Sequence, residues 1–246
     1  MAARPWVRAS WASTATAEPR LPPAVQLGNL GVRLGLALLA DRIDVEGADR
    51  LPDEPGVIVA SNHLSILDPP LITVSVARLI GRQVRYMAKA EAFDVPVVGS
   101  ILRAYGGFGV RRGRADREAY RAAQEVLASG AWLGLAPEGT RSRTGHLGEP
   151  KPGVALLAVR SGATVLPVGI SGSDRAWPVG ARLPRPGTRV TIRFGTPYRP
   201  AAADGDGGDA AAGAPNGRRA ALEAQSDDLM RRIAALVDPG YRGRFG

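Results

Sequence analysis

The sequence predicts a single α/β domain whose mixed, largely parallel β-sheet is flanked by helices. Short, continuous apolar runs such as 56–60 and 132–136 are typical of strands that are buried on both faces. These runs alternate with stretches of helical periodicity, as they do in βαβ units. A chain of 246 residues with 45% hydrophobic and 5% aromatic residues is long enough for one core built mainly from aliphatic side chains.

The N-terminal part of the chain predicts a leader and then one helix. Residues 1–25 lack periodicity, and we expect them to be flexible. Residues 26–40 predict a helix that contains the longest apolar stretch, Leu30–Ala40, which Arg33 interrupts. A membrane span needs about 20 apolar residues, so this stretch is too short to cross a bilayer. We therefore expect a helix that lies in the membrane interface, with a core helix packed on the domain as the alternative.

The α/β domain is expected over residues 41–199. Pro69 lies in the first turn of a helix, where proline is tolerated, and Gly130 and Gly162 follow the ends of two others. Pro167 lies inside an apolar strand and indicates an edge, a bulge or a strand that lines a site. The expected strands cover residues 42–45, 56–60, 84–88, 108–110, 132–136, 164–170 and 189–194, and the expected helices cover 71–80, 98–105, 117–129 and 152–161.

Two segments follow the predicted domain. Residues 200–217 consist largely of Ala, Gly, Asp and Pro, a composition that predicts a disordered loop. Residues 218–246 return to helical periodicity as far as Val237. We expect them to form a C-terminal helix that packs on the domain.

The composition excludes several kinds of chemistry. The chain has no cysteine, which rules out a disulfide, a thiolate nucleophile and a cysteine metal site. Its two histidines are His63 and His146, and no cluster of His, Asp or Glu has the spacing of metal ligands. We therefore expect no metal and no other cofactor.

The net charge of +9 gives a weaker indication about partners. The basic residues are spread along the chain, and almost all of them are arginines; the lysines are Lys89 and Lys151. No nucleic-acid-binding motif accompanies this charge, so we expect no nucleic-acid partner. Anionic lipid headgroups at a membrane surface are the simpler interpretation.

A histidine and an aspartate follow the strand expected at 56–60. His63 and Asp68 can pair if the turn between them folds back, and the Asp would fix the imidazole tautomer, making His63 a general base. Ser65 is close in sequence, but side chains two residues apart rarely face each other. A base without its own nucleophile suits activation of a substrate hydroxyl. In the alternative, Asp68 N-caps the next helix and His63 is a hydrogen-bonded turn residue.

A glycine-rich segment at 106–113 carries a pair of arginines. Glycines let the backbone approach a ligand, and the guanidinium groups of Arg111 and Arg112 can bind a phosphate bidentately. In a chain with so many arginines, an exposed surface is the alternative interpretation.

The segment at 137–142 follows the strand expected at 132–136. Its Gly139, Thr140 and Arg141 are residue types that bind phosphate or carboxylate groups. The neighbouring carboxylate of Glu138 is placed to position an arginine, Arg112 or Arg141, or to bind a substrate hydroxyl. A polar loop without a ligand is the alternative.

In this order and at these spacings, the segments resemble the glycerolipid acyltransferases of the lysophosphatidic acid acyltransferase type. The resemblance covers roughly residues 40–200 and the final helix. Arg111 departs from the family pattern, because an acidic residue often precedes the motif arginine; the extra positive charge favours a more anionic acceptor. The matching residues are Asn62, His63, Ser65 and Asp68 in the first motif, Gly106 through Arg112 in the second, Pro137–Ser142 in the third, Val165–Val168 in the fourth, and Lys151 and Gly153 in a Lys-x-Gly that follows the third.

The resemblance implies a glycerol-3-phosphate acyltransferase-like fold and a role for each matching residue. His63 would remove the proton of the acceptor hydroxyl while Asp68 holds the imidazole, and the hydroxyl oxygen would attack a thioester carbonyl without an acyl-enzyme. The implied phosphate-binding residues are Arg112, Gly139, Thr140 and Arg141, with Glu138 ordering their pocket.

The implied substrates are an acyl donor, acyl-CoA or acyl carrier protein, and a lysophosphatidic acid-type acceptor, 1-acylglycerol 3-phosphate or a similar lysophospholipid, giving phosphatidic acid. The implied location is the cytoplasmic face of the cell membrane, as a peripheral protein. Three alternatives remain: transfer to a different lipid acceptor (another lysophospholipid, an amino-acid-derived lipid or a glycolipid), hydrolysis through Ser65 or water, and non-catalytic lipid binding at a membrane.

Overall fold

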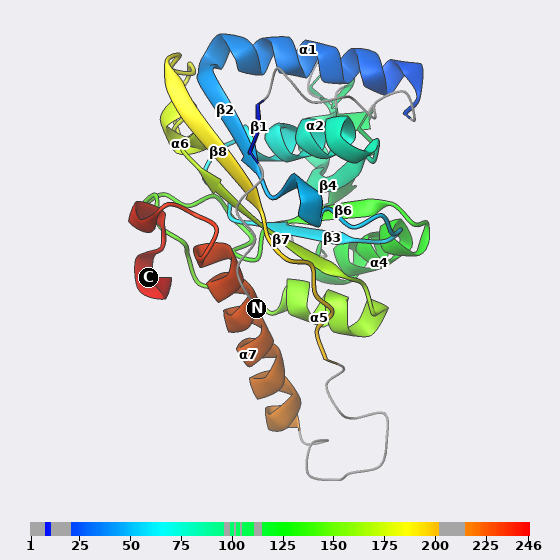
Figure 1. Ribbon diagram of the computed structural model, residues 1–246. Helices are drawn as coiled ribbons and strands as arrows, with labels where there is room; N and C mark the ends of the chain where they lie inside the picture. Colours follow the sequence, from blue (N-terminus) through cyan, green and yellow to red (C-terminus); the bar gives the residue numbers. More distant parts are fainter. Residues whose placement is uncertain are drawn as a thin grey trace.

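The structure, a computed structural model, describes residues 8–10, 21–95, 99–100, 102–103, 105–110, 115–201 and 215–246. In this part of the chain eight strands form one sheet, in the order β1-β2-β8-β7-β3-β6-β4-β5 (Figure 1). The strands are β1 (Arg8–Ser10), β2 (Ala40–Glu46), β3 (Ile58–Ser61), β4 (Val84–Lys89), β5 (Phe108–Val110), β6 (Trp132–Leu135), β7 (Val165–Ser171) and β8 (Thr188–Phe194).

The centre of the sheet is parallel. β3 lies between β6 and β7, and Ile58 faces Leu133 on one side and Val165 on the other. β4 and β5 extend the parallel part beyond β6, whereas β8 runs antiparallel to β7 and β1 antiparallel to β2. The predicted class, α/β with a mixed and largely parallel sheet, is confirmed. Because β6, β3 and β7 share a direction, their carboxyl ends meet at one edge, where such sheets place their sites.

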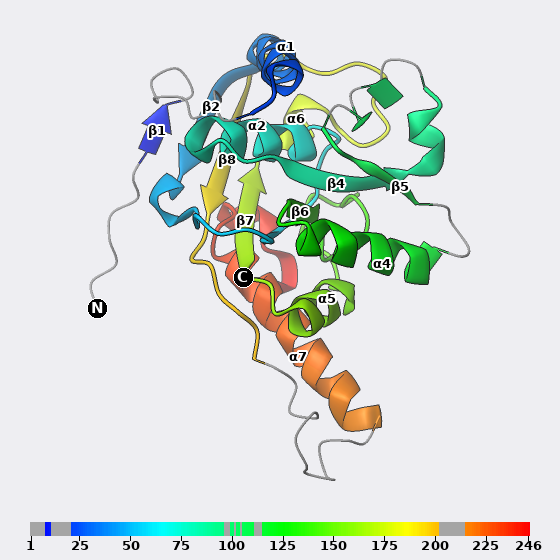
Figure 2. The same cartoon turned by 90° about the vertical axis from the view of Figure 1, so that its right-hand side faces the viewer.

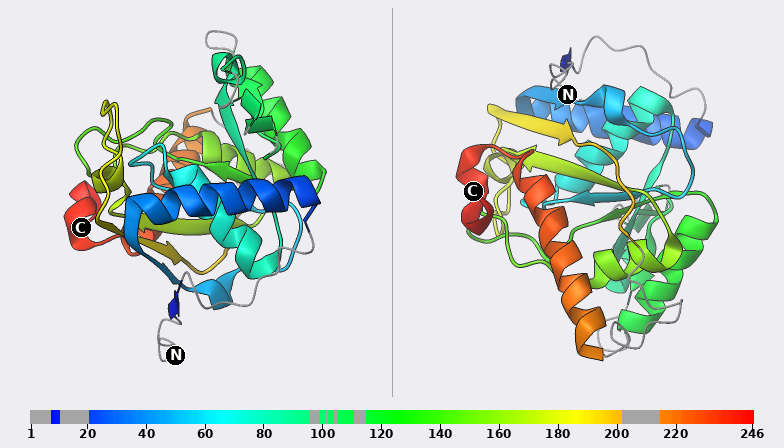
Figure 3. Two further views of the ribbon diagram at one scale, coloured as in Figure 1. Left: turned by 90° about the horizontal axis from the view of Figure 1, so that it is seen from above. Right: turned by 60° about the horizontal axis from the view of Figure 1, so that its bottom comes forward.

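Helices cover both faces of the sheet, α1 and α2 on one and α4, α5 and α7 on the other (Figures 1 and 2). Seen from above, α1 lies lengthwise across the molecule (Figure 3). A single helical turn, α6, follows the end of β7. The helices are α1 (Pro23–Leu39), α2 (Asp68–Ile80), α4 (Ala115–Ala128), α5 (Gly153–Ser161), α6 (Ser173–Ala176) and α7 (Pro215–Ala234), with short 3-10 turns at Ala48–Arg50, Ala90–Phe93, Pro239–Tyr241 and Gly243–Phe245.

The central strand shows why its sequence is continuously apolar. Val57 and Val59 pack in the cluster beneath α1 and α2, whereas Ile58 and Ala60 pack in the cluster beneath α4, α5 and α7. All four side chains are fully buried. Successive side chains of a strand point to opposite faces, so a strand covered on both faces needs an apolar residue at every position.

The N-terminal leader expected over 1–25 contains a strand. Arg8–Ser10 pairs antiparallel with residues 44–46 of β2, which gives those backbone groups hydrogen-bond partners. The rest of the leader up to residue 20 lies outside the described residues, and so does most of the loop expected at 200–217. The helix expected at 98–105 includes residues outside the described part, and those described between 99 and 103 are helical.

The C-terminal helix expected over 218–246 was predicted too long. α7 ends at Ala234, and the chain continues through the 3-10 turns Pro239–Tyr241 and Gly243–Phe245. Pro239 has no N–H and its ring clashes with a preceding helical turn, so a continuous helix cannot pass this point. The last residues therefore fold back toward the sheet edge that carries the predicted motifs, next to the end of β7.

Pro167 lies in a central strand, since β7 is flanked by β3 and β8. Of the three interpretations of this proline, the edge strand is wrong, and a strand that lines a site stays a prediction. The carbonyl of Pro167 accepts a hydrogen bond from the Gly195 N–H at 2.8 Å, just beyond the last residue of β8.

Candidate functional site

Three loops meet at the carboxyl ends of β3, β6 and β7. The Asn62 side chain bonds both backbone groups of Ile170 in β7, donating to its carbonyl at 2.9 Å and accepting from its N–H at 2.8 Å. The Ser142 N–H donates to the His63 carbonyl at 2.7 Å. These bonds tie the loops into one unit. The loops are residues 62–68, 136–142 and 172–174.

The first loop brings His63 and Asp68 together. His63 Nδ1 lies 2.8 Å from Asp68 Oδ2, and the side chain of Asp68 is 2% exposed against 25% for His63. The carboxylate also accepts the N–H groups of Leu64 (2.6 Å) and Ser65 (2.7 Å) on Oδ2 and the Ser173 hydroxyl (2.5 Å) on Oδ1. In the tautomer that donates the Nδ1 proton to this carboxylate, Nε2 is left as the basic nitrogen.

The alternative role of Asp68 as an N-cap is wrong. Asp68 is the first residue of α2, Leu67 precedes it in the N-cap position, and no side-chain cap bond forms there. The carboxylate bonds the preceding turn and His63 instead. The negative charge at a helix N-terminus is nevertheless favourable, because the helix dipole is positive at that end.

Ser65 is not placed to act as a nucleophile. Its side chain is fully buried, and its hydroxyl donates to the Trp177 carbonyl at 2.8 Å and accepts the Leu67 N–H at 3.3 Å. A serine whose hydroxyl is bonded within the protein core cannot reach a bound ester. The hydroxyl holds the turn that contains His63.

Glu138 orders the backbone of the site. Its buried carboxylate accepts the His63 N–H on Oε1 at 3.2 Å and the Gly148 N–H on Oε2 at 2.9 Å. Burial raises the pKa of Glu138, although these two hydrogen bonds act in the opposite direction. No hydrogen bond or ion pair joins Glu138 to Arg141, although both residues line the same hollow, and Arg112 lies outside the described residues, so a contact of Glu138 with a substrate hydroxyl stays a prediction.

The loop after β6 leaves its polar groups accessible. Gly139 and Thr140 are exposed and Arg141 is half-buried, and they adjoin or line a hollow of about 480 Å³. Gly139 has φ +68°, and a Cβ built on it would lie 3.1 Å from the Lys151 ammonium, so this ammonium lies against the loop. The Lys151 N–H also donates to the Pro137 carbonyl at 2.8 Å. Neither Arg141 nor Lys151 has an ion pair with any of the described acidic residues.

The second motif reaches the structure only in part. Gly106 through Val110 are described, with β5 beside β4 at the end of the sheet. Arg111 and Arg112, the candidate phosphate ligands of this motif, lie outside the described residues. The predicted role of Arg112 therefore stays a prediction.

Ser173 is a site residue that sequence reasoning missed. It is fully buried at the start of α6, far along the chain from Asp68, yet its hydroxyl bonds the Asp68 carboxylate. The signal was weak: a serine two residues after a strand that contains a proline. Only the parallel alignment of β3 and β7 reveals that the two residues meet.

An apolar groove begins beside the loop at 136–142. Its volume is about 630 Å³, and it lies between α4, α5 and the end of β6. Four cationic side chains also line it: Arg117, Arg121, Lys151 and Arg160. The apolar lining residues include Met87, Leu135, Pro137, Val154, Leu156 and Leu157.

Two absences hold for the described part of the chain. It contains no group of three or more His, Cys, Asp or Glu side chains that could hold a metal ion. None of its helices is long and apolar enough to span a bilayer.

The site thus contains a histidine held by a carboxylate, beside a loop that carries Arg141 and against which Lys151 lies. A histidine of this kind is able to accept the proton of a bound hydroxyl, and the two cationic side chains are able to hold an anion. The acyltransferase family model matches residues 42–171, more than half of the sequence. The chain belongs to the acyltransferase family, as the motifs predict.

Two relatives that it resembles, one from a plant and one from a bacterium, carry the same activity in their names. It is 31% identical over 144 residues to the chloroplastic 1-acyl-sn-glycerol-3-phosphate acyltransferase LPAT1 of Arabidopsis thaliana, covering 57% of this chain and 39% of that protein. It is 31% identical over 140 residues to the 1-acyl-sn-glycerol-3-phosphate acyltransferase of Borreliella burgdorferi, covering 56% and 54%. The matches thus span about half, or less, of these relatives.

The fold is also that of a solved structure. The crystal structure of the 1-acyl-sn-glycerophosphate acyltransferase PlsC from Thermotoga maritima is similar with a TM-score of 0.60 and 27% sequence identity. The similarity covers 83% of this chain and 77% of that chain. The described sheet, the central loops and the helical layers therefore form a fold that a glycerolipid acyltransferase uses.

Proposed function

We propose that this protein transfers a fatty acyl group from an acyl thioester to the free hydroxyl of 1-acylglycerol 3-phosphate, or of a similar lysophospholipid, to form phosphatidic acid. The observation that carries the proposal is the pair of His63 and Asp68, at 2.8 Å, beside the loop that carries Arg141. The names of the plant and the bacterial relative support 1-acylglycerol 3-phosphate as the acceptor.

The chemistry needs one base and no covalent intermediate. His63 Nε2 takes the proton of the acceptor hydroxyl as its oxygen attacks the thioester carbonyl carbon. The carbon–sulfur bond then breaks, and the imidazolium returns the proton to the leaving thiolate. Asp68 stabilises the imidazolium in between. A base of this kind contributes about 10²–10⁴ to the rate, and positioning of the two substrates contributes about 7–11 kcal/mol more.

The cationic loop would hold the acceptor's phosphate. Arg141 can bind two phosphate oxygens, and the exposed Thr140 offers a hydroxyl, while the Gly139 N–H donates to the Ala136 carbonyl at 3.0 Å and so closes the turn that presents them. Lys151 adds a second positive charge beside Gly139. A phosphate anchored away from the reacting hydroxyl converts binding energy into orientation of that hydroxyl.

The apolar groove between α4 and α5 would hold the acyl chain of the donor. It opens at Pro137 and Gly139, next to the candidate phosphate-binding loop. The four cationic residues in its lining suit a donor whose carrier arm bears phosphate, which both acyl-CoA and acyl carrier protein provide.

The outer face of α1 would lie on the membrane. Leu27, Leu30, Leu34 and Leu38 are exposed, Leu38 by 79%, and their spacing places them on one face of the helix. Leu36 on the opposite face is buried in the core. A helix with leucines on both faces needs an apolar environment on both sides, and lipid would provide it for the outer face.

The two other classes of function fit less well. Hydrolysis through Ser65 conflicts with its buried, bonded hydroxyl. A lipid-binding protein without catalysis has no need of a histidine fixed by a carboxylate with three further donors.

The test is a thiol-release assay with purified protein, acyl-CoA and 1-acylglycerol 3-phosphate, in which the lipid products are resolved by mass. We expect thiol release that depends on the acceptor, with phosphatidic acid formed. Release without an acceptor would show a hydrolase instead. If there is no turnover with acyl-CoA, with an acyl carrier protein donor or with a panel of other lysolipids, the proposal is wrong.

A further inference from the structure

We propose that Tyr241, near the C-terminus, and Ser173 are positioning residues that hold the His63–Asp68 pair in register. The inference rests on the proposed function for its kinetic consequences and on hydrogen bonds alone for its structural ones. Two hydrogen-bonded paths start at Tyr241, and one ends on each member of the pair.

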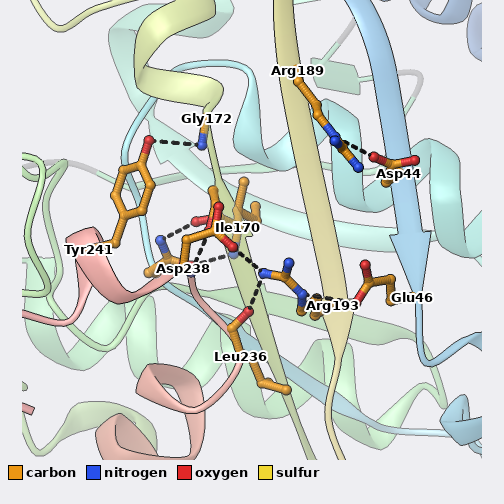
Figure 4. A network of polar contacts seen from close by, with 11 residues as sticks. Asp44, Glu46, Ile170, Gly172, Arg189, Arg193, Leu236, Asp238 and Tyr241 are labelled. Carbon is orange, nitrogen blue, oxygen red and sulfur yellow. Dashed lines mark hydrogen bonds and ion pairs between the residues drawn. The ribbon is translucent and has the colours of Figure 1, made fainter. Parts of the chain in front are cut away.

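The first path leads to Asp68. The Tyr241 hydroxyl accepts the Gly172 N–H at 3.1 Å and donates to Asp174 Oδ1 at 2.9 Å, so it holds the residues on both sides of Ser173; Figure 4 shows the bond to Gly172. Ser173 in turn donates to Asp68 Oδ1 at 2.5 Å. Because Oδ2 carries the bond to His63, the serine fixes the rotation of the carboxylate plane.

The second path leads to His63. The Tyr241 carbonyl accepts the Leu147 N–H at 2.8 Å. The next residue, Gly148, donates its N–H to Glu138 Oε2, and Glu138 Oε1 accepts the N–H of His63. The side chain of Tyr241 therefore supports the carboxylate, and its main chain supports the backbone of the histidine.

The segment that carries Tyr241 is itself anchored to the sheet. The Asp238 N–H donates to the Ser171 hydroxyl at 2.9 Å, and Asp238 Oδ1 accepts from Arg193 Nη1 at 2.8 Å. Arg193 on β8 also bonds the Leu236 carbonyl and Glu46 on β2, as Figure 4 shows. Strands β7 and β8 thus bond the segment that carries the tyrosine directly, and β2 supports it through the contact of Glu46 with Arg193.

The tyrosine keeps its proton over the working pH range. Burial and the hydrogen bond to Asp174 raise the pKa of Tyr241 to about 12. Its hydroxyl is therefore able to donate and accept at once, which a phenylalanine of the same shape cannot do.

The inference is tested on the imidazole itself, with the full chain labelled with ¹⁵N. The sequence has two histidines, so His146→Gln assigns the His63 signals. At a pH where the imidazole is neutral, ¹⁵N shifts report which ring nitrogen carries the proton. We expect the Nδ1–H tautomer in the wild type and a rise of the Nε2–H tautomer in Ser173→Ala, with a smaller rise in Tyr241→Phe.

The same variants are assayed for turnover. We expect kcat to fall roughly 10- to 100-fold in Ser173→Ala, with less change in KM, because misplacement of a reacting group by about 1 Å has effects of this order. Ser173→Thr keeps the hydroxyl and should recover much of the tautomer ratio. Ser226→Ala is the matched control, since that buried serine bonds only the Leu222 carbonyl in α7. Tyr198→Phe is the control for Tyr241→Phe.

The outcomes separate this inference from the proposed function. An unchanged tautomer ratio in both Ser173→Ala and Tyr241→Phe would overturn it, even if kcat or the melting temperature fell. A shift of the ratio in the controls as large as in the variants would overturn it too. A wild-type protein that transfers no acyl group would refute the proposed function, while the tautomer ratios would still decide the positioning roles.

Discussion

The site has a buried half and a solvent-exposed half, which differ in whether their polar side chains are bonded within the protein. The carboxylates of Asp68 and Glu138 are buried, and backbone N–H groups and the side chains of neighbouring residues occupy their oxygens. Arg141 and Lys151 are partly or fully open to solvent and have no ion pair with the described acidic residues. The polar groups of the first half are bonded within the protein, and under the proposed function a ligand completes the second half.

This difference reflects two tasks. A base must be aligned before the substrate arrives, and buried hydrogen bonds supply alignment because an unpaired polar group there is costly. An anion-binding group must exchange its partner in every turnover, and solvent-exposed cations can do so. Under the proposed function the exposed leucines of α1 belong with the second kind, since lipid would cover them.

The largest effect is expected from a change in the first half of the site, which contains His63 and the buried carboxylates. His63→Ala removes the base, and we expect transfer to fall by about 10²–10⁴-fold. Thermal unfolding should be nearly unchanged, because the imidazole is partly exposed. Acceptor-dependent thiol release measures the effect, and a variant that keeps a tenth of wild-type transfer would refute the role of His63 as base.

A change in the solvent-exposed half of the site, which contains Arg141 and Lys151, should affect acceptor binding rather than turnover. In Arg141→Ala we expect the acceptor KM to rise roughly 10- to 100-fold, the equivalent of one or two charge-assisted hydrogen bonds, with little change in the donor KM. Arg231→Ala, at an exposed position on α7, is the matched control. Equal rises in both KM values would contradict the phosphate role and blur the distinction between the halves.

The leucines of α1 extend the comparison to the membrane. A double variant, Leu34→Glu with Leu38→Glu, should reduce binding to anionic vesicles by about 10-fold or more, because each leucine buried in lipid is worth about 1.5–3 kcal/mol. Sedimentation with vesicles measures the bound fraction. The double variant Ala220→Glu with Ala224→Glu places the same two charges on an exposed part of α7, on the other face of the sheet (Figure 1). If it reduces binding equally, the effect is one of net charge and α1 is not the contact.

The smallest effect concerns stability and sharpens the description of the buried half. The pKa of Glu138 is raised by burial above its ordinary 4.5. At a pH between 4.5 and the raised pKa of the folded state, the carboxyl binds a proton when the protein is folded and loses it on unfolding. The contribution of Glu138 to the free energy of unfolding therefore falls as the pH rises. The size is roughly 1.4 kcal/mol per unit of pKa difference.

Urea unfolding of the wild type and of Glu138→Gln, from pH 4.5 upward, measures this contribution. The difference between the two, wild type minus variant, should fall with rising pH, whatever the constant cost of the glutamine amide. A difference that stays flat or rises would show that Glu138 is not buried in the way the structure describes.

Local signals predicted most of the elements. The apolar run at 56–60 predicted a buried central strand, and Gly130 and Gly162 marked helix ends; Gly162 has φ +64° as a C-cap requires. The predicted length of the last helix was wrong. Its periodicity continues through residues 218–237, but the chain leaves the helix where the contact of Asp238 with Ser171 becomes more favourable. Periodicity describes one face of a helix and carries no information about competing tertiary contacts.

The sequence by itself determined the α/β class, the pairing of His63 with Asp68, and the nature of the loop that carries Arg141, because strand patterning and motif spacing are local properties of the chain. Only the tertiary structure decided that Glu138 bonds the backbone of His63, that Ser173 bonds Asp68, and that Tyr241 lies behind both. These contacts join residues that are between 67 and 105 positions apart, and they follow from which strands lie side by side. The order of β7, β3 and β6 in the sheet is set by the packing of the whole core, which no single segment encodes.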